Sequence, residues 1–174
     1  MALLRGINVG KAKQLPMEAL RALAEELGFA DVATHLRSGN LVYATDEASQ
    51  VAAARLEAAI PERFGLHSSV LVRTATQIAA VVAHDPLRAV SANDSRYHVV
   101  FLPEPPEADG AAELLALDLA PDALAIEGRE VYYWCPNGMS DSRAVDALAA
   151  AKLARHGTDR NWNTVARLAQ MLAG

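Results

Sequence analysis

Four polar segments hold the residues of this sequence that are best suited to chemistry: residues 5–11 (RGINVGK), 37–40 (RSGN), 132–143 (YYWCPNGMSDSR) and 158–168 (TDRNWNTVARL). Most of their polar side chains are guanidinium, ammonium, amide or hydroxyl groups, which donate hydrogen bonds to phosphate and carboxylate oxygens. The segments therefore predict a site for an anionic, phosphate-bearing ligand, either a nucleotide-like small molecule or a segment of nucleic acid. The predicted ligand-binding residues are Arg5, Asn8, Lys11, Arg37, Ser38, Asn40, Asn137, Ser142, Arg160, Asn161 and Asn163.

Each segment also has a purely structural interpretation, which the sequence leaves open. The glycines of residues 5–11 permit a sharp turn, and Gly39 and Asn40 are suited to the positive φ values of a tight hairpin. Helix capping accounts for a further group of polar residues, for which the candidates are Ser140, Asp141, Ser142, Thr158 and Asp159.

Residues 5–11 are typical of a loop that turns backbone N–H groups toward an anion before a helix begins. The segment does not match the Walker A pattern, which needs four residues between its glycines and Ser or Thr after its lysine. Here three residues separate Gly6 from Gly10, and Ala12 follows Lys11. The sequence therefore gives no support to nucleoside triphosphate hydrolysis.

The aromatic run at residues 132–134 precedes a polar turn, and such a strand can stack on a base or a sugar. No Gly-Phe-Val-Phe string of the kind found in RNA-binding sheets accompanies it. Nucleic acid therefore stays an alternative to a small molecule.

Catalytic constellations are scarce in this sequence. Its five histidines lie far apart, outside the four segments and without the spacing of a metal site. The single cysteine, Cys135, follows an apolar stretch and precedes a proline, as a buried free thiol does. We therefore predict no metal and no cofactor. An enzyme that acts on the same ligand through Ser142 or Lys11 stays the alternative.

Charge is unevenly distributed along the 174 residues, whose net charge is −5. This total argues against a protein that binds nucleic acid or a membrane surface through bulk electrostatics. Residues 1–13 nevertheless carry three basic and no acidic residues, and residues 143–167 carry five basic and two acidic residues. A local cationic face would form if these two regions met.

No apolar run approaches the roughly 18 residues that span a bilayer, and the start of the chain lacks the pattern of a secretory signal. We therefore expect a cytoplasmic protein that does not enter a membrane. The oligomeric state is left open.

Hydrophobic periodicity predicts the order β-α-β-β-α-β for the first half, with strands at 2–5, 32–36, 41–44 and 69–73 and helices at 16–28 and 48–64. The second half repeats this order without a clear last strand. It is predicted to have strands at 97–102, 123–126 and 131–134 and helices at 77–83, 108–117, 142–153 and 160–172.

The strings ALLRGINVG, SGN, PNG and RNWNTV resemble the bacterial family of domain of unknown function 1697 (DUF1697). The resemblance implies an α+β fold of two pseudo-repeated ferredoxin-like halves, which agrees with the element order. It brings no catalytic residues. We expect the halves at residues 1–74 and 75–174, the second with the extra C-terminal helices, folded as one compact unit.

A common binding site requires that the two ends of the chain meet, so that Arg5 and Lys11 share a pocket with Arg160. A structural alternative is that Asn161 and Asn163 bond to the glycine loops and lock the halves together.

Overall fold

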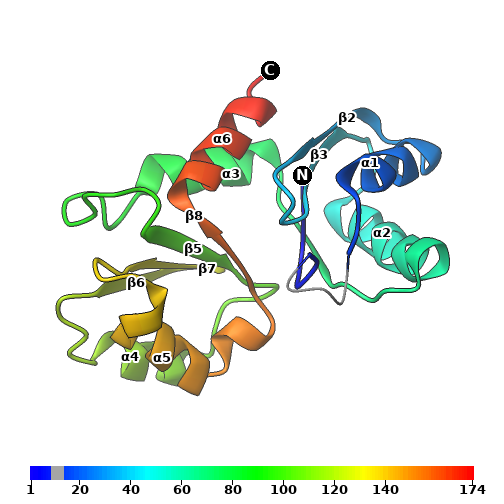
Figure 1. Ribbon diagram of the computed structural model, residues 1–174. Helices are drawn as coiled ribbons and strands as arrows, with labels where there is room; N and C mark the ends of the chain where they lie inside the picture. The colour runs from blue at the N-terminus through cyan, green and yellow to red at the C-terminus, as the bar shows by residue number, and fades with distance from the viewer. Residues whose placement is uncertain (9–13) are drawn as a thin grey trace. The chain divides into compact units, whose positions relative to one another are not determined.

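The computed structural model describes residues 1–8 and 14–174 (Figure 1). They form two compact units, one made of Met1–Ile78 with Leu168–Gly174 and the other of Ala79–Arg167. Each unit contains a four-stranded antiparallel sheet, and six α-helices accompany the two sheets within these ranges. The mixed helix and strand content that the sequence predicts is confirmed. Among the described residues, no helix is long and apolar enough to cross a membrane.

The sheet of the first unit has the strand order β2-β3-β1-β4. Helices α1 (Met17–Glu26) and α2 (Ser49–Phe64) pack on one face of this sheet, and the buried side chains of helices and strands form a single apolar core (Figure 1). The strands are β1 (Ala2–Leu4), β2 (Ala30–His35), β3 (Asn40–Ala44) and β4 (Val70–Val72).

Helix α1 forms where the sequence predicts a helix. Leu20, Leu23 and Ala24 recur at three- and four-residue spacing and are all buried against the sheet. Gly28 adopts a φ of 83° just beyond the last turn, a conformation that favours glycine and ends the helix.

The hairpin between β2 and β3 differs in one respect from the prediction. Its positive φ values belong to Leu36 (56°) and Gly39 (80°), whereas Asn40 begins β3. A Cβ atom at position 39 would lie 2.7 Å from Cδ1 of Ile7 and 2.8 Å from Cβ of Leu4. Gly39 is therefore required both by the backbone conformation and by the lack of space.

The sheet of the second unit has the order β6-β7-β5-β8. Helices α4 (Ala108–Leu115) and α5 (Arg143–Ala150) contribute to an apolar core on one face of this sheet. The strands are β5 (Tyr97–Phe101), β6 (Ala123–Glu127), β7 (Glu130–Trp134) and β8 (Thr158–Asn161). The unit also contains the short 3₁₀ helices η1 (Met139–Asp141) and η2 (Leu153–Arg155).

Two further helices, α3 (Ala75–His84) and α6 (Trp162–Leu172), each contain a boundary between the units. Trp162, the first residue of α6, stacks on Tyr97 of β5 with ring centroids 4.6 Å apart. Side chains alternate between the two faces along a strand, so Tyr97 and Val100, three positions apart, lie on opposite faces of the sheet. Trp162 therefore contacts the face opposite the core that contains Val100.

The predicted helix over residues 160–172 is partly wrong, because residues 158–161 form β8 and pair with β5. Thr158 and Asp159 therefore do not cap a helix. Helix α6 begins only at Trp162, and the Oδ1 atom of Asn161 accepts the backbone N–H of Thr164 at 3.0 Å. The cap lies three residues after the first predicted position because long-range strand pairing overrides the local helical pattern.

Candidate functional site

A polar pocket of about 500 Å³ lies in the first unit, beside the residues that follow β1 and those that precede β4. The two strands are antiparallel neighbours, and Leu4 pairs with Val70. Their pairing therefore brings together the residues that follow β1 and the residues that precede β4. The pocket is lined by Arg5, Gly6, Glu57, His67, Ser68 and Ser69.

Hydrogen bonds fix the wall of this pocket. The backbone N–H of Arg5 donates to the carbonyl oxygen of Ser69 at 3.0 Å and to Oγ of Ser68 at 3.1 Å. The Ser68 hydroxyl donates to the carbonyl oxygen of Arg5 at 2.9 Å. On the α2 side, Oε1 of Glu57 accepts the backbone N–H of Val70 at 2.7 Å, so part of its negative charge is compensated by a fixed donor.

His67 and Ser69 are the lining residues most open to a ligand. Both are exposed, and neither side chain has a hydrogen-bond partner within residues 1–8 and 14–174. An imidazole N–H and a hydroxyl can both donate to an anionic oxygen. Together with the guanidinium of Arg5, they give the pocket the donors that phosphate recognition requires.

Arg5 was predicted as a site residue, whereas His67, Ser68 and Ser69 were not. They lie outside the four polar segments, in a short stretch with no motif. Only the pairing of β1 with β4, which joins positions more than 60 residues apart, brings them to Arg5. A single sequence carries no local signal for that proximity.

The first two polar segments meet in this unit through structural bonds. The amide of Asn8 donates to the carbonyl oxygens of Leu15 and Arg37 at 2.9 and 2.6 Å and accepts the N–H of Leu15 at 2.7 Å. Asn8 therefore ties the end of the first loop to the β2–β3 hairpin. Arg37 in turn donates from Nη2 to Oε1 of Gln14 at 2.9 Å. Lys11 lies outside the described residues.

Asn40 also has a structural partner set. Its side chain is wholly buried and donates from Nδ2 to the carbonyl oxygen of His35 at 2.7 Å and to Oγ of Ser38 at 3.0 Å. These bonds close the hairpin on itself. Ligand contact by Asn40 or Ser38 stays a prediction.

Ser142 lies in the second unit and forms the N-cap of α5, as predicted for one of three candidates. Its hydroxyl is buried, donates to Oδ2 of Asp122 at 2.7 Å and accepts the N–H of Val145 at 3.1 Å. Oδ2 of Asp122 also accepts the N–H of Ala144 at 3.0 Å. Both partners of the cap are thus engaged inside the unit.

Arg160 is also in the second unit and is only 6% exposed. Its Nη1 donates to Oγ1 of Thr158 at 2.8 Å and to the carbonyl oxygen of Asp159 at 2.6 Å. Burial lowers the pKa of this guanidinium to about 10, although the charge of Asp159 opposes the shift. Three other predicted residues also lie in this unit. Asn137 and Asn163 are exposed, whereas Asn161 is half-buried and caps α6.

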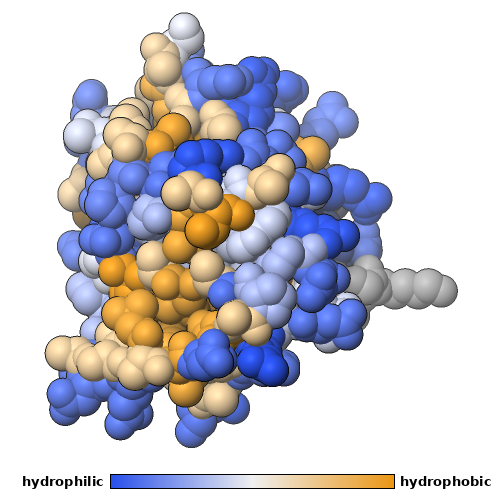
Figure 2. Space-filling model, turned by 90° about the vertical axis from the view of Figure 1, so that its left-hand side faces the viewer, coloured by the Kyte–Doolittle hydropathy of each residue, from blue (hydrophilic) through white to orange (hydrophobic). Residues whose placement is uncertain are grey.

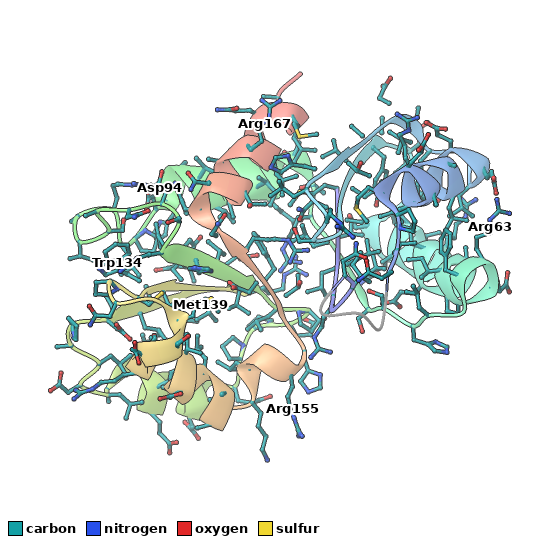
Figure 3. The ribbon with its side chains drawn as sticks, in the orientation of Figure 1. Arg63, Asp94, Trp134, Met139, Arg155 and Arg167 are labelled. Carbon is teal, nitrogen blue, oxygen red and sulfur yellow. The ribbon has the colours of Figure 1, made fainter. Side chains whose placement is uncertain are left out.

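Two of the basic residues near the end of the sequence lie far apart. Figure 3 shows the side chains of Arg155 and Arg167 at opposite ends of the second unit. Whether Arg5 and Lys11 share a site with Arg160 stays a prediction.

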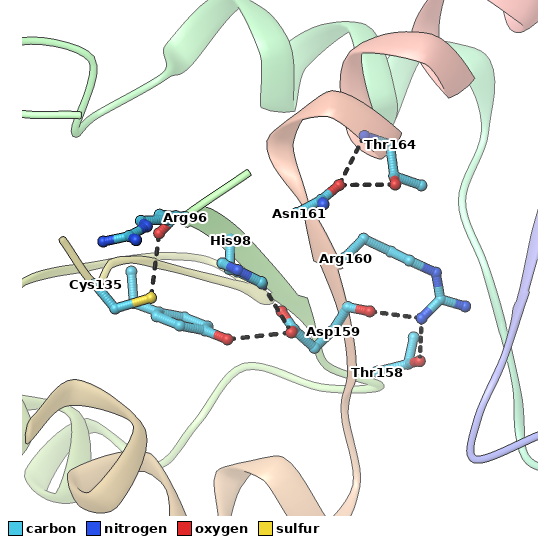
Figure 4. Close-up of polar contacts among 9 residues, drawn as sticks. Arg96, His98, Cys135, Thr158, Asp159, Arg160, Asn161 and Thr164 are labelled. Carbon is cyan, nitrogen blue, oxygen red and sulfur yellow. Dashed lines mark hydrogen bonds and ion pairs between the residues drawn. The ribbon is translucent and has the colours of Figure 1, made fainter. Parts of the chain in front are cut away.

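A cluster that the sequence did not single out joins three strands of the second sheet (Figure 4). Oδ2 of Asp159 lies 3.0 Å from Nδ1 of His98 and accepts the hydroxyl of Tyr133 at 3.1 Å. The rings of His98 and Tyr133 are stacked with centroids 4.9 Å apart. Burial and the neighbouring carboxylate raise the pKa of Tyr133, so its hydroxyl stays a donor.

Cys135, two residues after Tyr133, is fully buried in the same core. Its thiol donates to the carbonyl oxygen of Arg96 at 3.3 Å, and burial raises the pKa of this thiol. A thiol in such surroundings is a poor nucleophile. Within the described residues, no group of three or more His, Cys, Asp or Glu side chains is placed to hold a metal ion.

The second unit also has an apolar groove of about 460 Å³ beside α4 and α5. Figure 2 shows apolar side chains gathered on the face of the molecule that this unit turns toward the viewer. Residues that line the groove include Leu114, Leu117, Ala147, Ala150 and Leu153. Nothing in their chemistry identifies an occupant.

Comparisons with known proteins agree with the fold described above. A family model described as "Protein of unknown function (DUF1697)" matches residues 1–132. A solved structure, that of the conserved bacterial protein SP0830 from Streptococcus pneumoniae, is similar with a TM-score of 0.78 and 24% sequence identity. The match covers 98% of this chain and 96% of that chain. At this identity the likeness concerns the fold alone. No curated protein gave a significant match.

Proposed function

The chain belongs to the DUF1697 family of proteins of unknown function, and from that premise we propose that it is a binding module for an anionic, phosphate-bearing ligand. The observation that carries the proposal is the polar pocket in which Arg5 lies beside His67 and Ser69. These three side chains are cationic or hydrogen-bond donors, and the two that follow α2 are open to solvent.

A backbone donor offsets part of the negative charge in the pocket. Glu57 is the acidic lining residue, and the N–H of Val70 already donates to it. The guanidinium group of Arg5 is planar and cationic, and its shape matches phosphate geometry. Gly6, with a φ of 65° and no side chain, lets a ligand approach the backbone closely.

A small molecule fits these features better than nucleic acid does. The pocket volume of about 500 Å³ lies within the range of small-molecule sites. The net charge of −5 would repel a long polyanion, since non-specific binding to nucleic acid depends on many cationic contacts. A nucleotide-like ligand is therefore the form of the proposal that we favour.

Catalysis through Ser142 finds no support in the contacts of that residue. Ser142 is 2% exposed, and its hydroxyl both donates to Asp122 and accepts from Val145. A nucleophile needs a nearby base and access to substrate. Lys11, the other residue of that alternative, lies outside the described residues.

We also propose that the two units are pseudo-repeats with the ferredoxin-like order. What supports this is a position-by-position correspondence in which β1, β2, β3 and β4 match β5, β6, β7 and β8. The strand orders β2-β3-β1-β4 and β6-β7-β5-β8 are then the same order. Helices α1 and α2 correspond to α4 and α5. A cytoplasmic location and the packing of both halves into one compact unit stay predictions as well.

Calorimetry at low salt tests the binding proposal, with mononucleotides, sugar phosphates and short RNA and DNA oligonucleotides as probes. Arg5→Met is expected to weaken binding of a phosphate probe by about tenfold or more, because a hydrogen bond to a charged group is lost. The matched control is Arg21→Met, which removes an exposed arginine of α1 that pairs with Glu25 outside the pocket. Absence of binding by all probes, or equal losses in the two variants, contradicts the proposal.

A further inference from the structure

The cluster of His98, Asp159 and Tyr133 lies outside the pocket described above and points to a second site. We propose that His98 is the hydrogen-bond acceptor of a binding site in the second unit, and that its ligand carries a hydroxyl next to an anionic group. This inference does not depend on the proposed function, because it rests on residues of another sheet.

Asp159 determines which nitrogen of His98 is free. Its Oδ2 lies 3.0 Å from Nδ1, and a carboxylate at that distance holds the imidazole proton on Nδ1. When the ring carries only this proton, its lone pair is on Nε2. Tyr133 fixes the arrangement, since its hydroxyl donates to the same Oδ2 and its ring stacks on His98 at an interplanar angle of 15°.

The second oxygen of the Asp159 carboxylate differs from the first. Oδ1 of Asp159 is buried and has no hydrogen-bond partner within the described part of the chain. A buried acceptor without a partner destabilises the folded state. This atom is a cost of placing a carboxylate beside His98 and Tyr133. An apolar residue would leave no such atom, but it would also remove the acceptor that both side chains use.

Nε2 of His98 is the nitrogen that the contacts of the described residues leave unused. Nine-tenths of the side chain is buried, with 10% exposed, and Nε2 has no hydrogen-bond partner in residues 1–8 and 14–174. An unprotonated imidazole nitrogen accepts a hydrogen bond, so the complementary group of a ligand is a donor.

Two donors flank His98 on the same sheet face. Asn161 is directly opposite His98 in the pairing of β5 with β8, so their side chains are neighbours. Its Oδ1 is used in the cap of α6, which leaves the Nδ2 donors without a partner among the described residues. Arg96 precedes His98 by two residues and pairs with Cys135, so it projects on the same face. It is exposed, and its guanidinium forms no ion pair in the described ranges.

These three groups define the chemistry of the ligand. A hydroxyl would donate to Nε2 of His98, while a phosphate or carboxylate would accept from Arg96 and from the amide of Asn161. Neighbouring positions on a sheet are roughly 5 to 7 Å apart. The hydroxyl and the charged group must therefore be separated by only a few bonds, as in a hydroxyalkyl phosphate or a 2-hydroxycarboxylate.

The first test observes the histidine side chains of the full chain by ¹H–¹⁵N correlation spectroscopy, with signals assigned from single-histidine variants. We expect His98 to be protonated on Nδ1 and not on Nε2. A ring protonated on Nε2 overturns the proposal without any substitution that could disturb folding. His156, which is exposed, provides the control signal.

The second test compares probes that differ only in the hydroxyl, namely glycerol 3-phosphate with propyl phosphate and lactate with propionate. We expect the hydroxyl-bearing member of at least one pair to shift the His98 signals and to bind about tenfold or more tightly. The pair that responds identifies the anionic group. Equal binding within both pairs, or no shift of His98 with any probe, overturns the proposal. The titrations are repeated in Arg5→Met, so that binding in the first pocket is recognised.

Asp159→Asn links the two tests. An amide at position 159 can donate to Nδ1 of His98, which moves the ring proton to Nε2 and removes the acceptor. The preference for the hydroxyl-bearing probe should then be lost, while the His156 signals stay unchanged. A variant that keeps both the preference and the original tautomer contradicts the role of Asp159.

Discussion

The hydroxyl of Ser142 and the carboxylate of Asp122 form a 2.7 Å hydrogen bond in the interior of the second unit, across 20 residues of sequence. Asp122 also accepts the N–H of Ala144, and Ser142 accepts that of Val145. The two side chains together satisfy donors at the start of α5, which otherwise lack helical partners. The short segment before Ala123 is thereby attached to α5.

Removal of this double cap should destabilise the protein. We expect Ser142→Ala to reduce the free energy of unfolding by about 1 to 2 kcal/mol, as for loss of an N-cap. Asp122→Ala should reduce it by about 2 to 4 kcal/mol, because two buried donors lose their acceptor. Urea unfolding followed by circular dichroism measures both. The exposed Asp141 of η1 provides the control, since Asp141→Ala should change the value by less than about 0.5 kcal/mol.

Two glycines should respond in opposite directions to substitution by alanine. Gly39→Ala forces a side chain into a φ of 80° and against Ile7 and Leu4, so a loss of about 2 kcal/mol or more is expected. Gly110 lies in α4 with nothing within 4 Å of an added Cβ. Gly110→Ala should therefore stabilise by about 0.5 to 1 kcal/mol, because alanine is the better helix former. Equal melting temperatures for the two variants would contradict the hairpin geometry.

Substitution of Asn161 and of Asn163 should change stability by different amounts, although both residues belong to one predicted motif. Asn161 accepts both the N–H and the hydroxyl of Thr164, and Asn163 is exposed. We expect Asn161→Ala to lower the unfolding free energy by about 1 kcal/mol or more. Asn163→Ala should stay within about 0.5 kcal/mol of the parent. A drop of several degrees in the melting temperature of Asn163→Ala would instead favour the structural lock considered for this residue.

Tyr43 should make stability depend on pH in the alkaline range. Burial, assisted by the charge of Glu47, raises the pKa of its phenol from 10.0 to about 12. The folded state thus holds this proton more tightly, so the contribution to stability is present below pH 10 and is lost as the pH rises through 12. Urea unfolding at a series of pH values between these limits measures the slope.

Tyr43→Phe is the matched variant for this slope. The Tyr43 hydroxyl is buried without a partner in the described residues, whereas its ring stacks on Phe29 with centroids 4.5 Å apart. The phenylalanine keeps the stacking and removes the orphan hydroxyl, so stability at pH 7 should be unchanged or higher by up to about 1 kcal/mol. An equally steep alkaline slope in this variant would assign the effect to another group.

Local patterns predicted most elements of the fold. The hairpin at residues 127–130 turns through Gly128, whose φ is 58°, and the predicted helix at 48–64 is α2 within one residue. Both features depend on signals a few residues apart, namely turn chemistry and helical periodicity. The sequence therefore predicts them well.

Features that depend on distant strand pairing were missed. β8 is short and polar, and it is a strand because residues 158–161 bond to β5, about 60 positions earlier. The same pairing creates the cluster of His98, Tyr133 and Asp159, each from a different strand. The pocket is an intermediate case, since Arg5 lies in a recognisable motif and its partners 67–69 do not.

The alternation of acid and base along β8 makes its alignment with β5 critical for charge. Asp159 contacts the imidazole of His98 on one face of the sheet, and Arg160 is buried on the other face. A slip by one residue would exchange them, so that a guanidinium would meet His98 and a carboxylate would be buried in its place. Gly157 stands just ahead of these residues, and a Cβ there would lie 2.6 Å from Cγ1 of Val100. Insertions or deletions between η2 and β8 should thus be tolerated far less than in an ordinary surface connection.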